Sequence, residues 1–264
     1  MNGVFTKSIG FGAASLLAGF VLAGPALADG LPTRGKVRTT EVNERPCSTS
    51  ANVAFTTDFV FRGISVSNEE AAVQGGVDLT CGNFYAGVWG SSFGLGDDGS
   101  LWLNAYGGYR ATMGHITWDV GFIYYTFPGS FGGDVDFVEL KLAASGEVWK
   151  GGRLGGVVYY APDYVGTFDS AWTVEGSFAQ VLPNVGFFTP VFSATVGHTF
   201  FSEQHYGYDL DYTYWNVGLT LGFHEKWSLD LRYWDTQNEG LAELANYYGG
   251  LADERFVATL KYRF

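Results

Sequence analysis

Charged side chains stand at every second position of several apolar segments, and they are the first candidates for chemistry. At the end of the chain, Lys261 and Arg263 alternate with Leu260, Tyr262 and Phe264. Charges of both signs on one face predict an enclosed polar space partly crossed by ion pairs, since a charge removed from water needs a partner. The charges placed on this face are Asp58, Arg62, Asp78, Arg110, Asp119, Glu139, Lys141, Glu175, Asp230, Arg232, Lys261 and Arg263.

The histidines offer little support for catalysis. A hydrolase needs a nucleophile beside an oriented histidine, but His115 and His224 fall at expected tight turns and His205 in an expected loop. His198 alternates with an apolar face. The sequence also contains no zinc-ligand spacing, phosphate loop or dinucleotide motif. We therefore expect a protein that is not an enzyme, without catalytic residues, cofactor or metal.

The segments that carry the charges read as about twelve β-strands. Apolar and polar residues alternate with a period of two, and each run is about ten residues long, enough for a tilted strand to cross a bilayer. The expected strands are 52–61, 71–80, 84–90, 101–111, 115–127, 136–148, 153–161, 171–182, 190–200, 211–223, 227–234 and 255–264.

The connections between these strands alternate between short and long. Tight turns are expected at 81–83, 112–114, 149–152 and 224–226, with a looser one at 181–189, and long loops at 62–70, 91–100, 128–135, 162–170, 201–210 and 235–254. This rhythm is typical of an all-β fold, the transmembrane antiparallel up-and-down barrel with an even number of strands. A secreted β-sandwich with a core of aromatic residues is the alternative.

The N-terminus indicates export. Lys7 supplies a positive charge, residues 9–23 are apolar, and Ala26-Leu27-Ala28 resembles a cleavage site, so residues 1–28 are expected to be a signal peptide. An N-terminal membrane helix is the alternative. Residues 29–51 are expected to form a periplasmic arm and residues 52–264 a barrel in the outer membrane of a Gram-negative bacterium.

The composition agrees with a membrane barrel and excludes one class of partner. Aromatic residues make up 17% of the chain and charged residues only 16%, whereas charged residues are about a quarter of an average soluble domain. The net charge of -12 leaves no basic face for a phosphate backbone, so nucleic acid is not an expected partner.

Cys47 and Cys81 are the two cysteines, and an even pair in an exported protein is more often bridged than free. Cys47 lies just before the first expected strand and Cys81 in the first tight turn. Both are thus expected at the periplasmic rim, where a disulfide would tie the arm to the barrel; reduced thiols are the alternative.

Seven blocks of the sequence form a recognisable pattern, namely 52–67, 74–78, 84–91, 125–129, 138–140, 160–164 and 211–215. They resemble the TorF-like family, proteobacterial outer-membrane β-barrels classed as porins and long without an established function. The chain departs from that pattern at Phe59, where a Tyr is expected, and at Trp102 and Asn104, where an acidic pair is expected. The resemblance implies an outer-membrane barrel and a porin role, and names no substrate.

The C-terminus resembles an outer-membrane assembly signal, because Tyr262 and Phe264 end an alternating strand. The expected partners are therefore outer-membrane lipid, lipopolysaccharide, the barrel assembly machinery and small hydrophilic solutes. We expect a porin that passes such solutes or ions by passive diffusion, with its oligomeric state left open. The alternatives are a non-conducting structural barrel whose ion pairs fill the lumen, a surface receptor or adhesin acting through acidic loops, and, with least support, an outer-membrane lipid-modifying enzyme.

Overall fold

The computed structural model describes residues 47–92, 94, 101–128, 135–165, 170–202, 209–237, 239–247 and 249–264. The expected signal peptide, and the arm as far as residue 46, lie outside the described residues.

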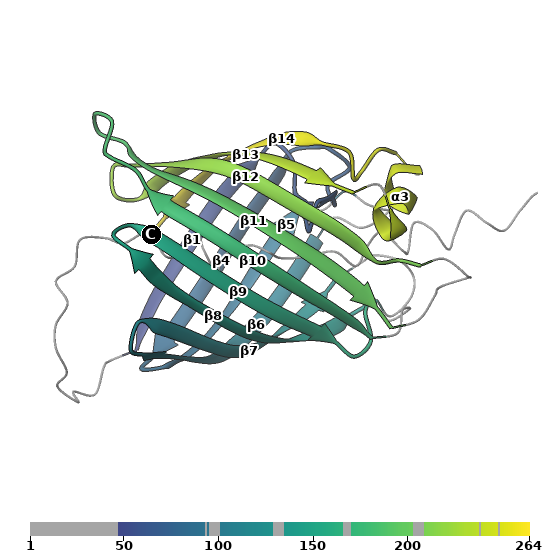
Figure 1. Cartoon of the computed structure of the whole chain (residues 1–264), viewed down its shortest axis with the longest axis horizontal. Helices are drawn as coiled ribbons and strands as arrows, with labels where there is room; N and C mark the ends of the chain where they lie inside the picture. Colours follow the sequence, from purple (N-terminus) through teal and green to yellow (C-terminus); the bar gives the residue numbers. More distant parts are fainter. Residues whose placement is uncertain are drawn as a thin grey trace, which may run out of the picture.

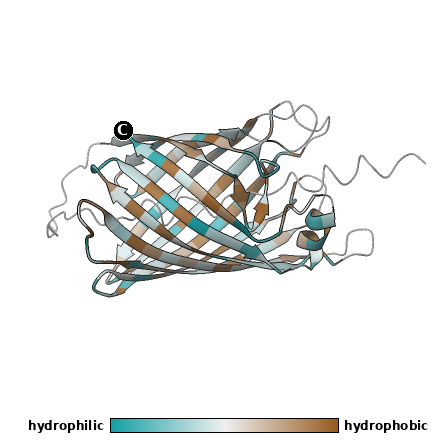
Figure 2. Cartoon of the chain, turned by 90° about the horizontal axis from the view of Figure 1, so that it is seen from above, coloured by the Kyte–Doolittle hydropathy of each residue, from teal (hydrophilic) through white to brown (hydrophobic). Residues whose placement is uncertain are grey.

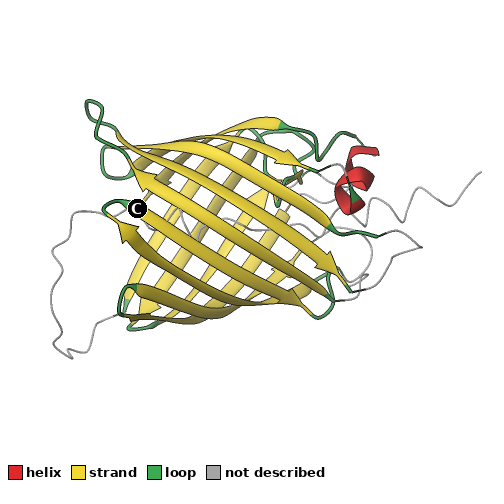
Figure 3. Cartoon of the chain, viewed as in Figure 1, coloured by secondary structure: helices red, strands yellow, loops and turns green. Residues whose placement is uncertain are grey.

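Twelve antiparallel strands form a closed barrel in which each strand pairs with its neighbours in the chain, and β1 closes the wall against β14 (Figures 1 and 3). This confirms the predicted all-β up-and-down barrel. The wall consists of β1 (Ser48–Thr56), β4 (Ala72–Cys81), β5 (Phe84–Ser92), β6 (Leu101–Met113), β7 (Ile116–Thr126), β8 (Phe137–Trp149), β9 (Gly152–Ala161), β10 (Ala171–Val181), β11 (Thr189–Phe201), β12 (Tyr212–Phe223), β13 (Trp227–Thr236) and β14 (Arg255–Arg263).

The two ends of the barrel differ in their connections. The turn end carries the short connections, such as Gly82-Asn83 between β4 and β5, and also the C-terminus (Figure 1). The loop end carries the long connections, including the one between β13 and β14 that contains α3 (Gly240–Tyr247). Leu241, Ala242 and Ala245 of α3 are buried. This helix lies within residues 235–254, which the sequence predicted to be a loop without a helix. Among the described residues, no helix is long and apolar enough to cross a membrane.

The register separates an outer from an inner face along the whole wall. Opposite pairs such as Leu229 and Leu260 point outward, whereas the next pair, Asp230 and Thr259, points inward. Large apolar side chains remain exposed on the outer face, with Val88 at 57%, and the strands show alternating hydrophobic and hydrophilic bands (Figure 2). An exposed apolar face of this kind is unfavourable in water and favourable in the hydrocarbon core of a bilayer.

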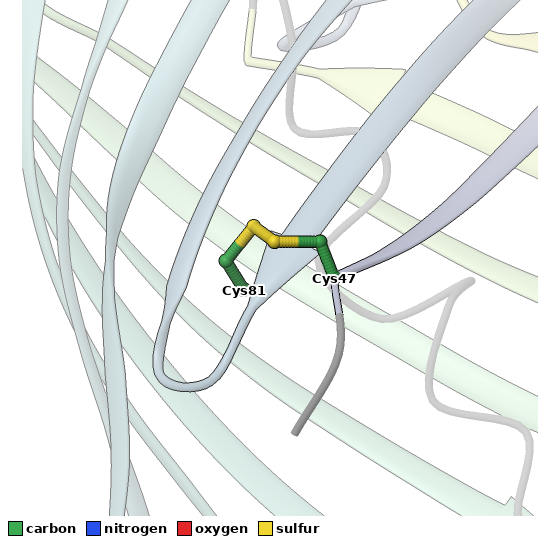
Figure 4. The surroundings of a disulfide bond; sticks show 2 residues. All are labelled: Cys47 and Cys81. Atoms are coloured by element: carbon green, nitrogen blue, oxygen red, sulfur yellow. A yellow bond between two sulfur atoms is a disulfide. The ribbon is translucent and has the colours of Figure 1, made fainter. Parts of the chain in front are cut away.

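The first strand is held unequally on its two sides. Its ladder to β4 runs along all nine residues of β1, whereas its ladder to β14 joins only residues 52–56 to 259–263. A disulfide links Cys47 to Cys81 with an S–S distance of 2.03 Å and a Cα–Cα distance of 4.3 Å (Figure 4). It joins the beginning of β1 to the end of β4 at the turn end.

The first strand differs from the expected one, and the expected boundary of the barrel at residue 52 is also wrong. β1 begins at Ser48 and ends at Thr56 rather than spanning 52–61. The chain then turns inward and forms a small hairpin from β2 (Val60–Phe61) and β3 (Ile64–Ser65). Residues 62–70 were therefore wrongly expected to form an external loop. The apolar alternation continues past Thr56 because these residues are buried inside the barrel rather than exposed outside it.

Candidate functional site

Residues 58–67, here called the plug hairpin, fill the lumen at the loop end. Phe61, Arg62, Ile64 and Val66 are all at most 1% exposed. Arg62 at the tip reaches Glu139 on β8, five places from β1 around the wall, so the hairpin crosses the barrel rather than following its rim. The lumen is therefore closed at this end in the described conformation.

The tip of the plug hairpin is a two-residue turn. Arg62 and Gly63 have φ angles of 45° and 86°, both in the left-handed region that a type I′ turn requires. Glycine adopts this conformation freely, but arginine does so at a cost. A Cβ at Gly63 would also stand only 2.8 Å from the Cβ of Tyr214. The turn is thus specified by a glycine and held in place by what Arg62 contacts.

Arg62 makes a two-bond ion pair with Glu139. Nη1 donates to Oε1 at 2.9 Å and Nη2 to Oε2 at 3.0 Å, and the two side chains are 0% and 2% exposed. Tyr125 also donates to Glu139 Oε2 at 2.7 Å. Burial alone would lower the pKa of Arg62, but attraction to Glu139, with smaller contributions from nearby tyrosines, raises this pKa well above its ordinary value. Arg62 therefore stays charged.

A second ion pair fastens the base of the plug hairpin. Arg255 on β14 donates from Nη1 to Asp58 Oδ2 at 3.0 Å and also lies 3.1 Å from Glu69. Ser65 and Ser67 donate to Asp58 Oδ1 at 2.7 and 2.8 Å. Asp58 thus organises the hairpin from within and joins it to the last strand.

Aromatic packing surrounds these charges. Phe59 lies edge-on to Trp89 and Trp102, with ring centroids 5.5 and 5.6 Å apart. Tyr164, fully buried in the connection after β9, lies within 3.5 Å of Arg62 Nη1. The plug hairpin therefore has an apolar core of its own, stabilised in the same way as the core of a soluble protein.

A second charged cluster lies on the inner wall nearer the turn end. Asp119 accepts hydrogen bonds from Tyr85 at 2.7 Å, from Lys141 at 3.0 Å and from Arg110 Nη2 at 2.9 Å. Arg110 lies over the ring of Tyr85, 4.8 Å from its centroid. This wall is less enclosed than the plug, because the Arg110 side chain is 53% exposed.

Tyrosines hold four of the lumen carboxylates against the wall, and three of these tyrosines lie opposite inward-facing glycines. A Cβ at Gly87 would stand 2.5 Å from Tyr106 Cζ, so glycine allows the ring to lie flat across the neighbouring strand. The hydroxyl then reaches the acid beside it. The donor–acceptor pairs are Tyr85 to Asp119, Tyr106 to Asp78, Tyr125 to Glu139 and Tyr214 to Glu175, and the glycines opposite Tyr85, Tyr106 and Tyr214 are Gly108, Gly87 and Gly197.

The structure divides the twelve charges singled out in the sequence between two levels of the lumen. At the loop end, the plug and the wall around it bring together Asp58, Arg62, Glu139 and Glu175. The inner wall towards the turn end carries Asp78, Arg110, Asp119, Lys141, Asp230, Arg232, Lys261 and Arg263. Arg255 and the tyrosine partners are not among the predicted site residues, although the same alternation places them on the inner face.

Solved β-barrel structures resemble this fold. The KdgM porin superposes with a TM-score of 0.55 at 9% identity, covering 81% of this chain and 99% of that one. The NanC porin superposes with a TM-score of 0.51 at 10% identity, covering 82% of this chain and 99% of that one. The COG4313 outer membrane channel from Pseudomonas putida F1 superposes with a TM-score of 0.51 at 15% identity, covering 86% of this chain and 99% of that one. At such identities the likeness concerns the fold alone.

Sequence comparison places the chain in a family. No curated protein matches the sequence. A family model described as a bacterial protein of unknown function (Gcw_chp) matches residues 41–264, which include every strand of the barrel. The chain therefore belongs to the Gcw_chp family.

Proposed function

We propose that this protein is an outer-membrane channel through which small hydrophilic solutes diffuse when the plug hairpin leaves the loop end. The observation that carries the proposal is the closed barrel with an apolar outer face and a charged lumen. A closed barrel leaves no unpaired strand edge in lipid. Part of the inner charge, such as the half-exposed Arg110, is open to water or solute.

The plug hairpin makes this a gated channel. Both latches, Arg62 with Glu139 and Asp58 with Arg255, are ion pairs in a buried setting. The desolvation cost of a buried pair offsets much of its attraction, so a plug held by ion pairs is easier to release than one held by apolar contacts alone. The gate and its latches are the elements that we expect solute flux to depend on.

Other features support the same proposal. The resemblance to TorF-like porins and the likeness to KdgM and NanC concern proteins classed as porins, and KdgM has been solved in complex with disordered oligogalacturonate. The expected signal peptide at 1–28 and the terminal Tyr262 and Phe264 fit export and insertion by the barrel assembly machinery. We propose no catalytic activity, and lipid and lipopolysaccharide as the barrel's surroundings.

A non-conducting barrel, or a receptor that acts through its loops, is the second candidate. The complete burial of Arg62 and Glu139 favours it, because such a plug could be a permanent core.

Single-channel recording in planar bilayers, with sugar-driven liposome swelling beside it, separates the two candidates. Wild type should open rarely, and Arg62→Met should open often because it leaves Glu139 buried without its partner. Arg62→Met combined with Glu139→Leu should open no more often than wild type, because an apolar pair needs no partner. Arg153→Met, which removes a lumen cation that bonds Ser145 and not the plug, should leave the opening frequency unchanged. If replacing residues 58–67 by a short Gly-Ser linker still gives a folded but silent barrel, the channel proposal is wrong.

A further inference from the structure

The lumen at the turn end contains a cavity that the plug does not fill. It has a volume of about 510 Å³ and is lined by inward-facing Tyr85, Arg110, Thr80 and Thr112 together with the turn residue Asn83. These groups are a cation, an aromatic ring, hydroxyls and an amide. Convergent polar groups in a concave site fix the orientation of a small ligand.

The charge of the turn-end wall is opposite in sign to that of the whole chain. The chain has a net charge of -12, yet the inward strand positions of this half carry six cations against four carboxylates. The cations are Arg110, Lys141, Arg153, Arg232, Lys261 and Arg263, and the carboxylates are Asp78, Asp119, Glu147 and Asp230. A cation-lined, low-dielectric space raises the local concentration of anions.

The hydrogen bonds hold the carboxylates against the wall and leave one of the cations accessible. Asp78 and Asp119 accept from Tyr106 and Tyr85, which hold the carboxylates to the wall. Arg110 uses Nε and Nη2 on Asp119, but its side chain is 53% exposed. Because a guanidinium carries five N–H donors, the remaining donors of Arg110 face the cavity. Lys141, 11% exposed, adds a second positive charge to the same carboxylate.

The groups around Arg110 indicate the chemistry of a ligand. A guanidinium with free donors suits a carboxylate, and the hydroxyls of Thr80 and Thr112 suit the hydroxyl groups of the same molecule. Thr112 also shares a hydrogen bond with Thr117 at 3.0 Å, and the amide of Asn83 donates to Tyr109 at 3.0 Å. The ring of Tyr85 fixes the plane of the guanidinium from behind, since Arg110 lies 4.8 Å over it. The cavity therefore suits a small anion with several hydroxyl groups.

We propose that this turn-end cavity is a binding site for hydroxylated carboxylates, with Arg110 as the residue that binds the carboxylate. The proposal rests on the channel function, whose solute class it names. Binding itself requires only that the turn end be open to solution, so the closed protein is suitable for the test.

Isothermal titration of the folded protein in detergent tests the site with gluconate, and with sorbitol as its uncharged counterpart. Gluconate should bind saturably and sorbitol should not. Arg110→Gln should weaken gluconate binding at least tenfold, Arg110→Lys should weaken it less, and Arg153→Gln should leave it within twofold. The heat-induced shift in gel mobility, absent from unfolded barrels, should be kept by all three variants.

Two outcomes would overturn the site. One is gluconate binding no tighter than sorbitol; the other is equal loss in Arg110→Gln and Arg153→Gln, which would show only a general field of the lumen. Failure of the channel proposal is recognised separately, because it is measured as conductance: gluconate binding in a barrel that stays silent without its plug would keep the site and refute the channel.

Discussion

The guanidinium of Arg62 and the carboxylate of Glu139 meet in the barrel interior through two parallel hydrogen bonds, although 77 positions separate them in the sequence. The arginine lies in a turn with a left-handed conformation, and the glutamate lies on β8, the sixth strand of the wall in chain order. The pair thus compensates for an unfavourable backbone and fixes where the hairpin ends. Its removal should affect both stability and gating.

The first prediction concerns the stability of this pair. Arg62→Met should lower the free energy of unfolding by about 3–5 kcal/mol, because it leaves a buried carboxylate unpaired. Arg62→Met with Glu139→Leu should recover most of that loss, since two apolar side chains need no partner. Urea unfolding in lipid vesicles, followed by tryptophan fluorescence, measures both. An equal loss in the single and double variants would mean that the pair itself is not what Arg62 contributes.

The second prediction separates crowding from backbone strain at the tip of the plug. Gly63→Ala should increase channel opening, because the new Cβ would meet Tyr214 at 2.8 Å and push the hairpin out. Gly82→Ala is the matched control: its φ of 63° is also left-handed, but nothing lies within 4 Å of the added Cβ. Planar-bilayer recording should show frequent openings in the first variant only. If Gly63→Ala and Gly82→Ala opened equally often, backbone strain rather than the contact with Tyr214 would be the cause.

The third prediction concerns the disulfide. Cys47 and Cys81 are 34 residues apart, and a loop of this length corresponds to about 4 kcal/mol of lost unfolded-state entropy. Cys47→Ser, Cys81→Ser and the double variant should all lower stability by one and the same amount, as should reduction of the wild type. Urea unfolding with and without dithiothreitol measures this. A reductant effect in the double serine variant would show that the loss does not come from this bond.

The fourth prediction tests which face of the wall meets lipid. Leu142 and Ala143 are neighbours on β8, but Leu142 points outward and is 50% exposed whereas Ala143 faces inward opposite Asp119. Leu142→Arg should cost about 2–4 kcal/mol near the bilayer midplane, while Ala143→Arg should cost much less because water and Asp119 are close. Folding yield into lipid vesicles compares them. If the order were reversed, the outer face would not be the lipid-facing one.

Alternation predicted the strands, and the rhythm of short and long connections predicted the barrel. On a strand of period two the apolar face must meet either lipid or a core. The same logic could not tell lipid from core after Thr56. Phe59 and Phe61 continue the apolar series of Val53 and Phe55, yet they pack inside the barrel. A signal was present in the Arg62-Gly63 pair, since a glycine at the second central position is typical of a two-residue hairpin.

The site was predictable as a set of charges but not as an arrangement. Parity along a strand gives the face of Asp119 or Lys141, whereas their meeting with Tyr85 depends on the register between separate strands. Register is set by the tertiary structure rather than by any one segment. The division of the lumen into a closed half and a basic half is likewise a property of the assembled wall.

The short ladder between β1 and β14 makes this the weakest seam in the barrel wall. Any lateral parting of the wall should begin there, where the fewest backbone hydrogen bonds must break, and the cystine at the other edge of β1 would keep that strand attached to β4. In such an opening, β1 would separate from β14, remain paired with β4, and pair with β14 again in the same register.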